Sequence, residues 1–198
     1  MKDVLISLQP KWCDLVALGE KTAEVRKTRP KIKPPFKVYI YETKGKKRKY
    51  TCRNLTSLDD DKKVYCEYDG IGAVIGEFIC NRIDDYHRFM IEDKDIRNKY
   101  EEKIVKDIES KACITLDYLR QYTSNLAHYD KFYIWHISNL VIYEKPKMLY
   151  DFVNYNKHEV CLQKNCFSGD CWGCPNNAIM VLPPQSWCYV KAIPDIPN

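Results

Sequence analysis

The stretch from Gly19 to Lys27 constrains the fold most, because a helix stop is followed at once by a strand with two unlike faces. Pro10 can open a short helix at its first turn, and Gly19 suits the position just after the helix ends. Apolar residues recur between them at helical spacing: Trp12, Leu15 and Val16. Because side chains alternate along a strand, one face of residues 22–26 carries three polar groups: Thr22, Glu24 and Arg26. The apolar residues between them can pack, so the pattern predicts a polar site on rigid backbone.

The rest of the chain has the pattern of an α+β domain. Apolar and aromatic runs predict further strands at residues 4–8, 36–42, 71–83, 132–143 and 187–190. Pro146 is expected to end the strand at 132–143. Helices are expected at 91–96, along Ile104, Ile108 and Ala112, and after the candidate N-cap Thr115, with a helical turn at 149–153. This order suits a mixed β-barrel with helices packed around it.

The length of 198 residues predicts one domain, with two elaborations. Residues 44–70 are expected to form a basic hairpin or loop, and residues 155–183 a cysteine-rich insertion. No run of 18 apolar residues exists, so no membrane association is expected. The first residues carry no signal-peptide pattern, which favours a cytoplasmic protein. Oligomeric state is left open.

Positive charge is concentrated in two places, and the chain carries a net charge of +5. The first cluster comprises Arg26, Lys27, Arg29, Lys31, Lys33 and Lys37. The second comprises Lys44, Lys46, Lys47, Arg48 and Lys49. Such clusters can contact phosphates, and the first adjoins the polar strand. The alternative is a solvated loop surface.

Four of the ten cysteines lie close together, in a C-x4-C-x4-C-x2-C pattern: Cys161, Cys166, Cys171 and Cys174. Four thiolates can close a tetrahedral zinc site, which would be structural because it leaves no open position. An iron–sulfur cluster, a disulfide pair or a loop of free thiols are the alternatives.

Several further residues are candidates for a catalytic or binding role. Lys21 and Glu24 could work together in a cleft, because a desolvated lysine can act as a base while Glu24 beside Arg26 stays ionised. The alternative is an ion pair that only orders the cleft. Glu77 is a candidate inward-facing carboxylate, whereas His136 is expected to be a hydrogen-bonded core residue. Three aromatic residues are candidates for stacking on a base: Tyr41, Trp187 and Tyr189.

The sequence also resembles the ASCH domain, a member of the PUA-like β-barrel superfamily. The likeness begins in Leu5-Ile6-Ser7-Leu8-Gln9-Pro10 and continues through Leu15-Val16-Ala17-Leu18-Gly19-Glu20-Lys21-Thr22. It returns at Ile75-Gly76-Glu77-Phe78, Trp135-His136-Ile137-Ser138 and Pro184-Gln185-Ser186-Trp187-Cys188-Tyr189-Val190. The pattern is similar to ASCH proteins of bacteria and their phages. The resemblance implies a PUA-like barrel that binds RNA or a modified nucleoside in the cleft between the barrel and its first helix.

Two branches of this family imply enzymatic activities. One branch removes the acetyl group from N4-acetylcytidine with a lysine, a threonine and a glutamate. Lys21 matches that lysine, but Glu24 stands where the branch has its threonine, Thr22 lies one strand position away, and Glu77 is a substitute for the glutamate. Another branch resembles a ribonuclease with tyrosine, lysine and serine, for which Lys21 and Ser186 are the counterparts.

Together these observations favour a nucleic-acid-related binding module. We expect it to bind RNA or a modified nucleoside beside residues 21–27, with contacts from Arg26, Lys27, Arg29 and the aromatic candidates. The first alternative is a hydrolase, either an amidohydrolase on N4-acylated cytidine or a metal-independent ribonuclease, that uses Lys21. A second alternative is a protein that binds a partner through its cysteine-rich tail.

Overall fold

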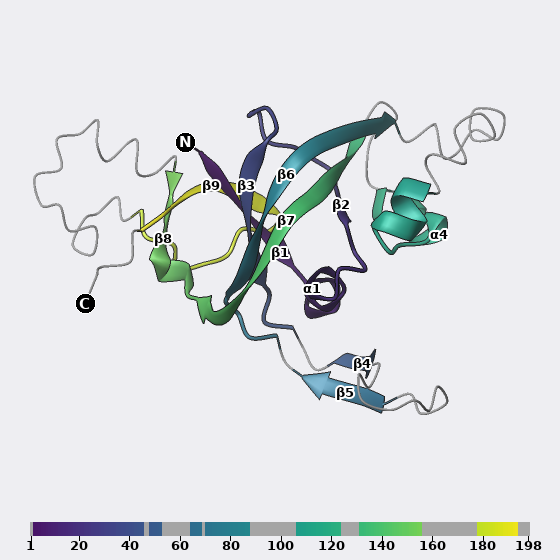
Figure 1. Ribbon diagram of the computed structural model, residues 1–198, viewed down its shortest axis with the longest axis horizontal. Coiled ribbons are helices and arrows are strands. Elements are labelled where there is room, and N and C mark those ends of the chain that lie inside the picture. Colours follow the sequence, from purple (N-terminus) through teal and green to yellow (C-terminus); the bar gives the residue numbers. More distant parts are fainter. Residues whose placement is uncertain are drawn as a thin grey trace, which may run out of the picture.

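The computed structural model describes residues 2–45, 48–52, 64–68, 70–87, 106–123, 131–155 and 178–193, with backbone alone for 48–52, 64–68 and 106. The opening elements are β1 (Asp3–Leu8), α1 (Pro10–Ala17) and β2 (Ala23–Arg26) (Figure 1). Pro10 occupies the first turn of α1, and Gly19 has a φ of +72° just after the helix. Both local signals in the sequence are therefore confirmed.

Seven of the described strands form one mixed sheet, as the α+β prediction requires. After β2, its strands are β3 (Phe36–Glu42), β6 (Val74–His87), β7 (Lys131–Lys147), β8 (Phe152–Asn154) and β9 (Trp187–Ala192). The order is β2-β7-β6-β3-β1-β9-β8, in which only β1 and β3 run parallel. The helices α1 and α4 (Leu116–Thr123) both lie on the β2 side of the sheet (Figure 1).

The ends of several elements differ from the sequence prediction. β7 runs through Pro146 to Lys147, because β6 pairing skips from Ile142 to Lys147 and the proline falls in this irregular stretch. A 3-10 turn at Leu149–Asp151 precedes β8, a strand that the sequence pattern did not indicate.

The predicted helical regions around residue 110 are observed in part. Ile108 and Ala112 repeat at the predicted helical spacing and are buried, but Ile108 belongs to a π-helical turn, η1 (Lys106–Lys111), and Ala112 follows that turn. Thr115 caps α4, because its hydroxyl accepts a hydrogen bond from the Tyr118 amide at 3.1 Å. The predicted helix at 91–96 lies outside the described residues.

A hairpin forms within the predicted basic elaboration. β4 (Arg48–Cys52) and β5 (Val64–Tyr68) pair antiparallel as a separate two-stranded sheet, beyond α1 in Figure 1. Lys46 and Lys47 lie outside the described residues. So does most of the cysteine-rich insertion, residues 156–177, with its four candidate zinc ligands.

Side-chain hydrogen bonds connect the edge strand β2 to the β1–β9 pair, where no strand pairing joins the described strands. Among the described strands, β2 is an edge that pairs with β7 alone. Arg26 on β2 donates from Nη2 to the Ser7 carbonyl at 2.8 Å and from Nη1 to Ser186 Oγ at 3.2 Å. The Trp187 indole donates to Thr28 Oγ1 at 2.9 Å. We refer to this junction between β2 and the β1–β9 pair as the seam.

Candidate functional site

A pocket of about 340 Å³ lies at the seam. Its walls come from the end of β1, from α1, from β2, from α4 and from the segment before β9. It brings together Lys21, Glu24, Arg26 and Ser186, four of the residues that the sequence singled out. The sequence separation of 160 residues between Arg26 and Ser186 is closed here by a hydrogen bond.

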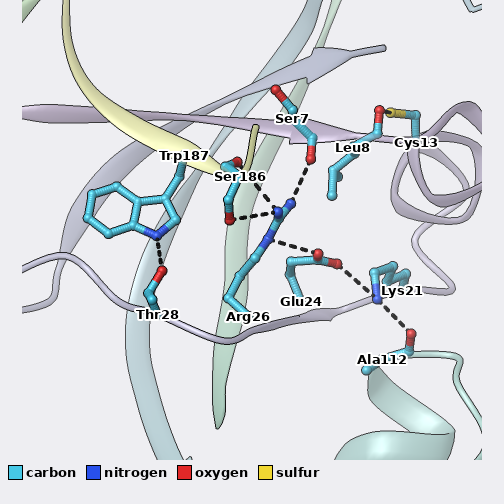
Figure 2. A network of polar contacts seen from close by, with 10 residues as sticks. All are labelled: Ser7, Leu8, Cys13, Lys21, Glu24, Arg26, Thr28, Ala112, Ser186 and Trp187. Atoms are coloured by element: carbon cyan, nitrogen blue, oxygen red, sulfur yellow. Dashed lines mark hydrogen bonds and ion pairs between the residues drawn. The ribbon is translucent and has the colours of Figure 1, made fainter. Parts of the chain in front are cut away.

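Three buried charged side chains form a row (Figure 2), and all three line this pocket. The Lys21 ammonium lies 3.1 Å from Glu24 Oε2, and the Nε of Arg26 lies 3.1 Å from Glu24 Oε1. All three residues are at least nine-tenths buried, with exposed fractions of 2%, 7% and 6%. Lys21 also donates to the Ala112 carbonyl at 2.6 Å. The row is thus fixed at both ends by backbone carbonyls, at Ala112 and Ser7.

The row leaves the pocket with an excess of positive charge. Of the residues that line it, Lys21 and Arg26 are cationic and Glu24 is the one acid. Two cations and one carboxylate give a formal charge of +1 in a site sheltered from water. Such a site favours a ligand that presents carbonyl or anionic oxygens, because charge-assisted hydrogen bonds are strongest away from water.

Aromatic rings from two helices form a second wall. Trp12 of α1 contacts Tyr118 of α4 edge-to-face, with ring centroids 5.9 Å apart. Tyr122 follows one turn later on α4 and also lines the pocket. Burial raises the pKa of Tyr122, so its phenol is neutral at physiological pH. The sequence pattern indicates Trp12 only as a packing residue of the first helix, and it gives no sign that Tyr118 and Tyr122 belong to a site, although their spacing of four residues places both on one helix face.

Three predicted site residues lie elsewhere. Thr22 precedes β2 and lines a different cavity, so it is not beside Glu24 in this pocket. Glu77 accepts hydrogen bonds from Lys37 at 2.7 Å and Tyr143 at 2.6 Å, away from the pocket. Burial opposes ionisation of Glu77, but these two bonds hold its pKa below the usual value. Tyr41 is buried in the apolar core, because both faces of β3 are covered.

Part of the predicted basic segment, residues 27–31, packs beside the seam. Lys27 lies over the Tyr122 ring, with Nζ 4.8 Å from the centroid, and Arg29 lies over Tyr133 at 5.6 Å. The Lys31 amide donates to the Tyr189 hydroxyl at 2.7 Å. Tyr189 and its neighbour Trp187 therefore hold this loop in place, and neither lines the pocket.

Within the described ranges, no group of three or more histidine, cysteine or acidic side chains is placed to hold a metal ion. The four candidate zinc ligands lie outside those ranges, so the zinc prediction stands as a prediction. None of the described helices is long and apolar enough to cross a membrane.

The mixed sheet with its first helix has the arrangement of the ASCH fold. A solved structure with this fold, ASCH from Zymomonas mobilis, is 15% identical and superposes with a TM-score of 0.52, covering 96% of this chain and 88% of that chain. Structures of a Tyr-to-Phe and a Ser-to-Ala variant of the same protein each give a TM-score of 0.51 at 15% identity, with coverage of 96% of this chain and 91% and 89% of theirs. No family model and no curated protein sequence matches. The likeness in structure shows that the chain has the ASCH fold, as the sequence resemblance implied.

Proposed function

We propose that the pocket at the seam binds one base of a single-stranded RNA, or a modified nucleoside. The observation that carries this proposal is the pairing of an aromatic wall with a buried row of hydrogen-bonding charges. A base needs both, because its flat face stacks on aromatic rings while its edge is read by polar groups.

The size of the pocket supports a small ligand. At about 340 Å³ it lies at the lower end of the range for small-molecule sites, about 300–1,000 Å³. It therefore suits one base or nucleoside and not a longer stretch of nucleic acid. Further nucleotides would run over the rim, where Lys27 and Arg29 offer positive charge to phosphates.

A hydrolase remains the second candidate, because Lys21 and the Ser186 hydroxyl line the same pocket. The contacts favour binding over catalysis. Lys21 donates to Ala112 and pairs with Glu24, whereas a general base must accept a proton. Ser186 Oγ accepts a hydrogen bond from Arg26, which orders the hydroxyl but draws electron density away from a nucleophile.

The test measures binding of a short fluorescent single-stranded RNA by anisotropy, for the unmodified protein and for Trp12→Leu. Loss of a stacked ring should cost about 1–3 kcal/mol, or roughly 5- to 150-fold in affinity. Tyr150→Leu is the matched control, because Tyr150 is half exposed and does not line the pocket. Equal affinities for all three proteins would contradict the proposal.

The same protein is incubated with N4-acetylcytidine and with the RNA, and the products are analysed by mass spectrometry. Deacetylation or cleavage that is lost in Lys21→Arg would establish the hydrolase instead. Intact substrates together with Trp12-dependent retention support the binding module.

A further inference from the structure

A second cavity, of about 490 Å³, shares no lining residue with the pocket at the seam. Its lining comes from four separate elements: Thr22 at the entrance to β2, Asn81 and Arg82 of β6, Lys111 of η1, and His136 and Ile137 of β7. Five of these six side chains are polar, three of them basic, and none is acidic. This composition differs from the seam pocket, which has an aromatic wall and a carboxylate.

An irregularity in the sheet builds this second cavity. β6 pairs with β7 at Cys80↔Ile137 and again at Ile83↔Trp135, so Asn81 and Arg82 together oppose the single residue His136. Two residues opposite one define a β-bulge, which turns side chains out of the regular alternation and recurs beside functional sites. Here the bulge brings the Asn81 amide and the Arg82 guanidinium to the rim that His136 and Thr22 share.

Two carboxylates outside the lining orient the basic groups. Arg82 Nη2 lies 3.1 Å from Asp84 Oδ2 and 2.9 Å from His136 Nε2, and His136 Nε2 lies 2.9 Å from the same carboxylate oxygen. Lys111 pairs with Asp107, which also accepts a hydrogen bond from Tyr86 at 3.1 Å. The Arg82 side chain stays 55% exposed and that of Lys111 34% exposed, so both remain open to a ligand.

We propose that this second cavity is a phosphate-binding site. A phosphate group presents three or four acceptor oxygens and negative charge, and the lining offers a guanidinium, an ammonium, an imidazole, a carboxamide and a hydroxyl. Arginine is suited to this role because its planar fork matches two phosphate oxygens at once.

The two cavities meet at neighbouring residues on two segments. Lys21 lines the seam pocket and Thr22 the second cavity, while the Ala112 carbonyl binds Lys21 and the Lys111 carbonyl accepts the Thr22 amide at 2.8 Å. This inference rests on the proposed function: the two cavities are close enough for one strand of RNA to place a base in the seam pocket and a nearby phosphate in the second cavity. A free phosphate or a phosphorylated small molecule is the other source of the same group.

The first experiment titrates the ¹⁵N-labelled protein with inorganic phosphate, against potassium chloride at the same ionic strength. We expect phosphate-specific shifts at the amides of Thr22, Asn81 and His136, and their loss in Arg82→Gln/Lys111→Gln. The control Lys131→Gln removes a cation that is also paired with a carboxylate, Asp85 at 2.7 Å, but does not line the cavity. It should keep the shifts.

The second experiment measures RNA affinity against salt concentration for the same variants. Each phosphate contact on a single strand contributes about 0.7 to the slope of log affinity against log salt, so the double variant, which removes the contacts to one phosphate, should lose about 0.7 if RNA supplies it. Phosphate-specific shifts with an unchanged slope assign the site to a free phosphate group. The proposal is overturned if millimolar phosphate shifts none of the amide signals of Thr22, Asn81 and His136 and the double variant leaves the salt dependence of RNA binding unchanged. Failure of Trp12→Leu to weaken RNA binding concerns the seam pocket alone, so the two proposals fail separately.

Discussion

Loss of the Glu24 carboxylate should destabilise this protein strongly, because it lies between two buried cations. Its two oxygens lie 3.1 Å from Lys21 Nζ and 3.1 Å from Arg26 Nε. In Glu24→Gln the local formal charge rises from +1 to +2 with no change in side-chain size. Neither cation can move into water easily, since both residues are more than nine-tenths buried.

The expected cost follows from removing one partner of a buried ion pair, which destabilises proteins by about 3–5 kcal/mol. Lys21→Met should cost less, about 1–3 kcal/mol, because Glu24 keeps Arg26 and the Ala112 carbonyl loses one charged donor. The double variant Lys21→Met/Glu24→Gln returns the local charge to +1. It should therefore be more stable than Glu24→Gln alone.

Urea denaturation of the four proteins measures these differences as a double-mutant cycle. We expect a coupling free energy of about 1–3 kcal/mol between the two positions. Thermal unfolding should show Glu24→Gln melting about 6–20 °C lower, because 1 kcal/mol shifts the midpoint by about 2–4 °C in a chain of this size. A Glu24→Gln protein within 1 kcal/mol of the original, or a double variant no more stable than Glu24→Gln, would refute the reasoning from buried charge.

Three further predictions concern other parts of the molecule. Hydrogen bonds from Lys37 and Tyr143 lower the folded-state pKa of Glu77, although burial alone would raise it. The stability that the Glu77 carboxylate contributes is therefore complete above its ordinary pKa of 4.5 and is lost as the pH falls through the lowered pKa. Glu77→Gln should flatten the dependence of the melting temperature on pH in that acid range. Thr115→Ala should cost about 1 kcal/mol in urea denaturation, because the Tyr118 amide loses its cap, and Thr115→Ser should retain most of it. The four-cysteine cluster should hold one zinc ion per chain by elemental analysis after purification without chelator, and serine at its four positions should abolish it; a metal-free original protein would contradict the zinc prediction.

Local chemistry explains which parts of the fold were predictable from the sequence. Pro10, Gly19 and Thr115 act within a few residues of themselves, so their roles were visible in the chain. Pro146 was misjudged because a break in long-range pairing accommodates it inside β7, and nothing beside it in the sequence shows that break. The same holds for β8, whose three residues are ordered by pairing with β9.

The candidate site was predictable only on one strand. Alternation correctly placed Glu24 and Arg26 on one side, with Ala23 and Val25 in an apolar cluster with η1 and α4. Alternation wrongly placed Thr22 on the same face as Glu24, because regular pairing of β2 begins at Ala23, one residue after Thr22. For Tyr41, alternation carries no information about exposure, since β3 is covered on both faces.

The seam explains why the candidate binding site and the stability of the fold should depend on the same residues. If backbone hydrogen bonds closed the sheet, the backbone groups of its edge strands would be paired without any side chain. The strands would then lie too close together to leave a pocket between them. Here Arg26 makes the junction from β2 to Ser7 and Ser186, and its length leaves a cavity beside the bond that it forms. The guanidinium requires Glu24 as a counter-ion, and Glu24 in turn holds Lys21. The charges that would recognise a ligand are therefore the charges that join the sheet, so a variant with weakened binding must be shown to be folded before its residue is assigned to recognition.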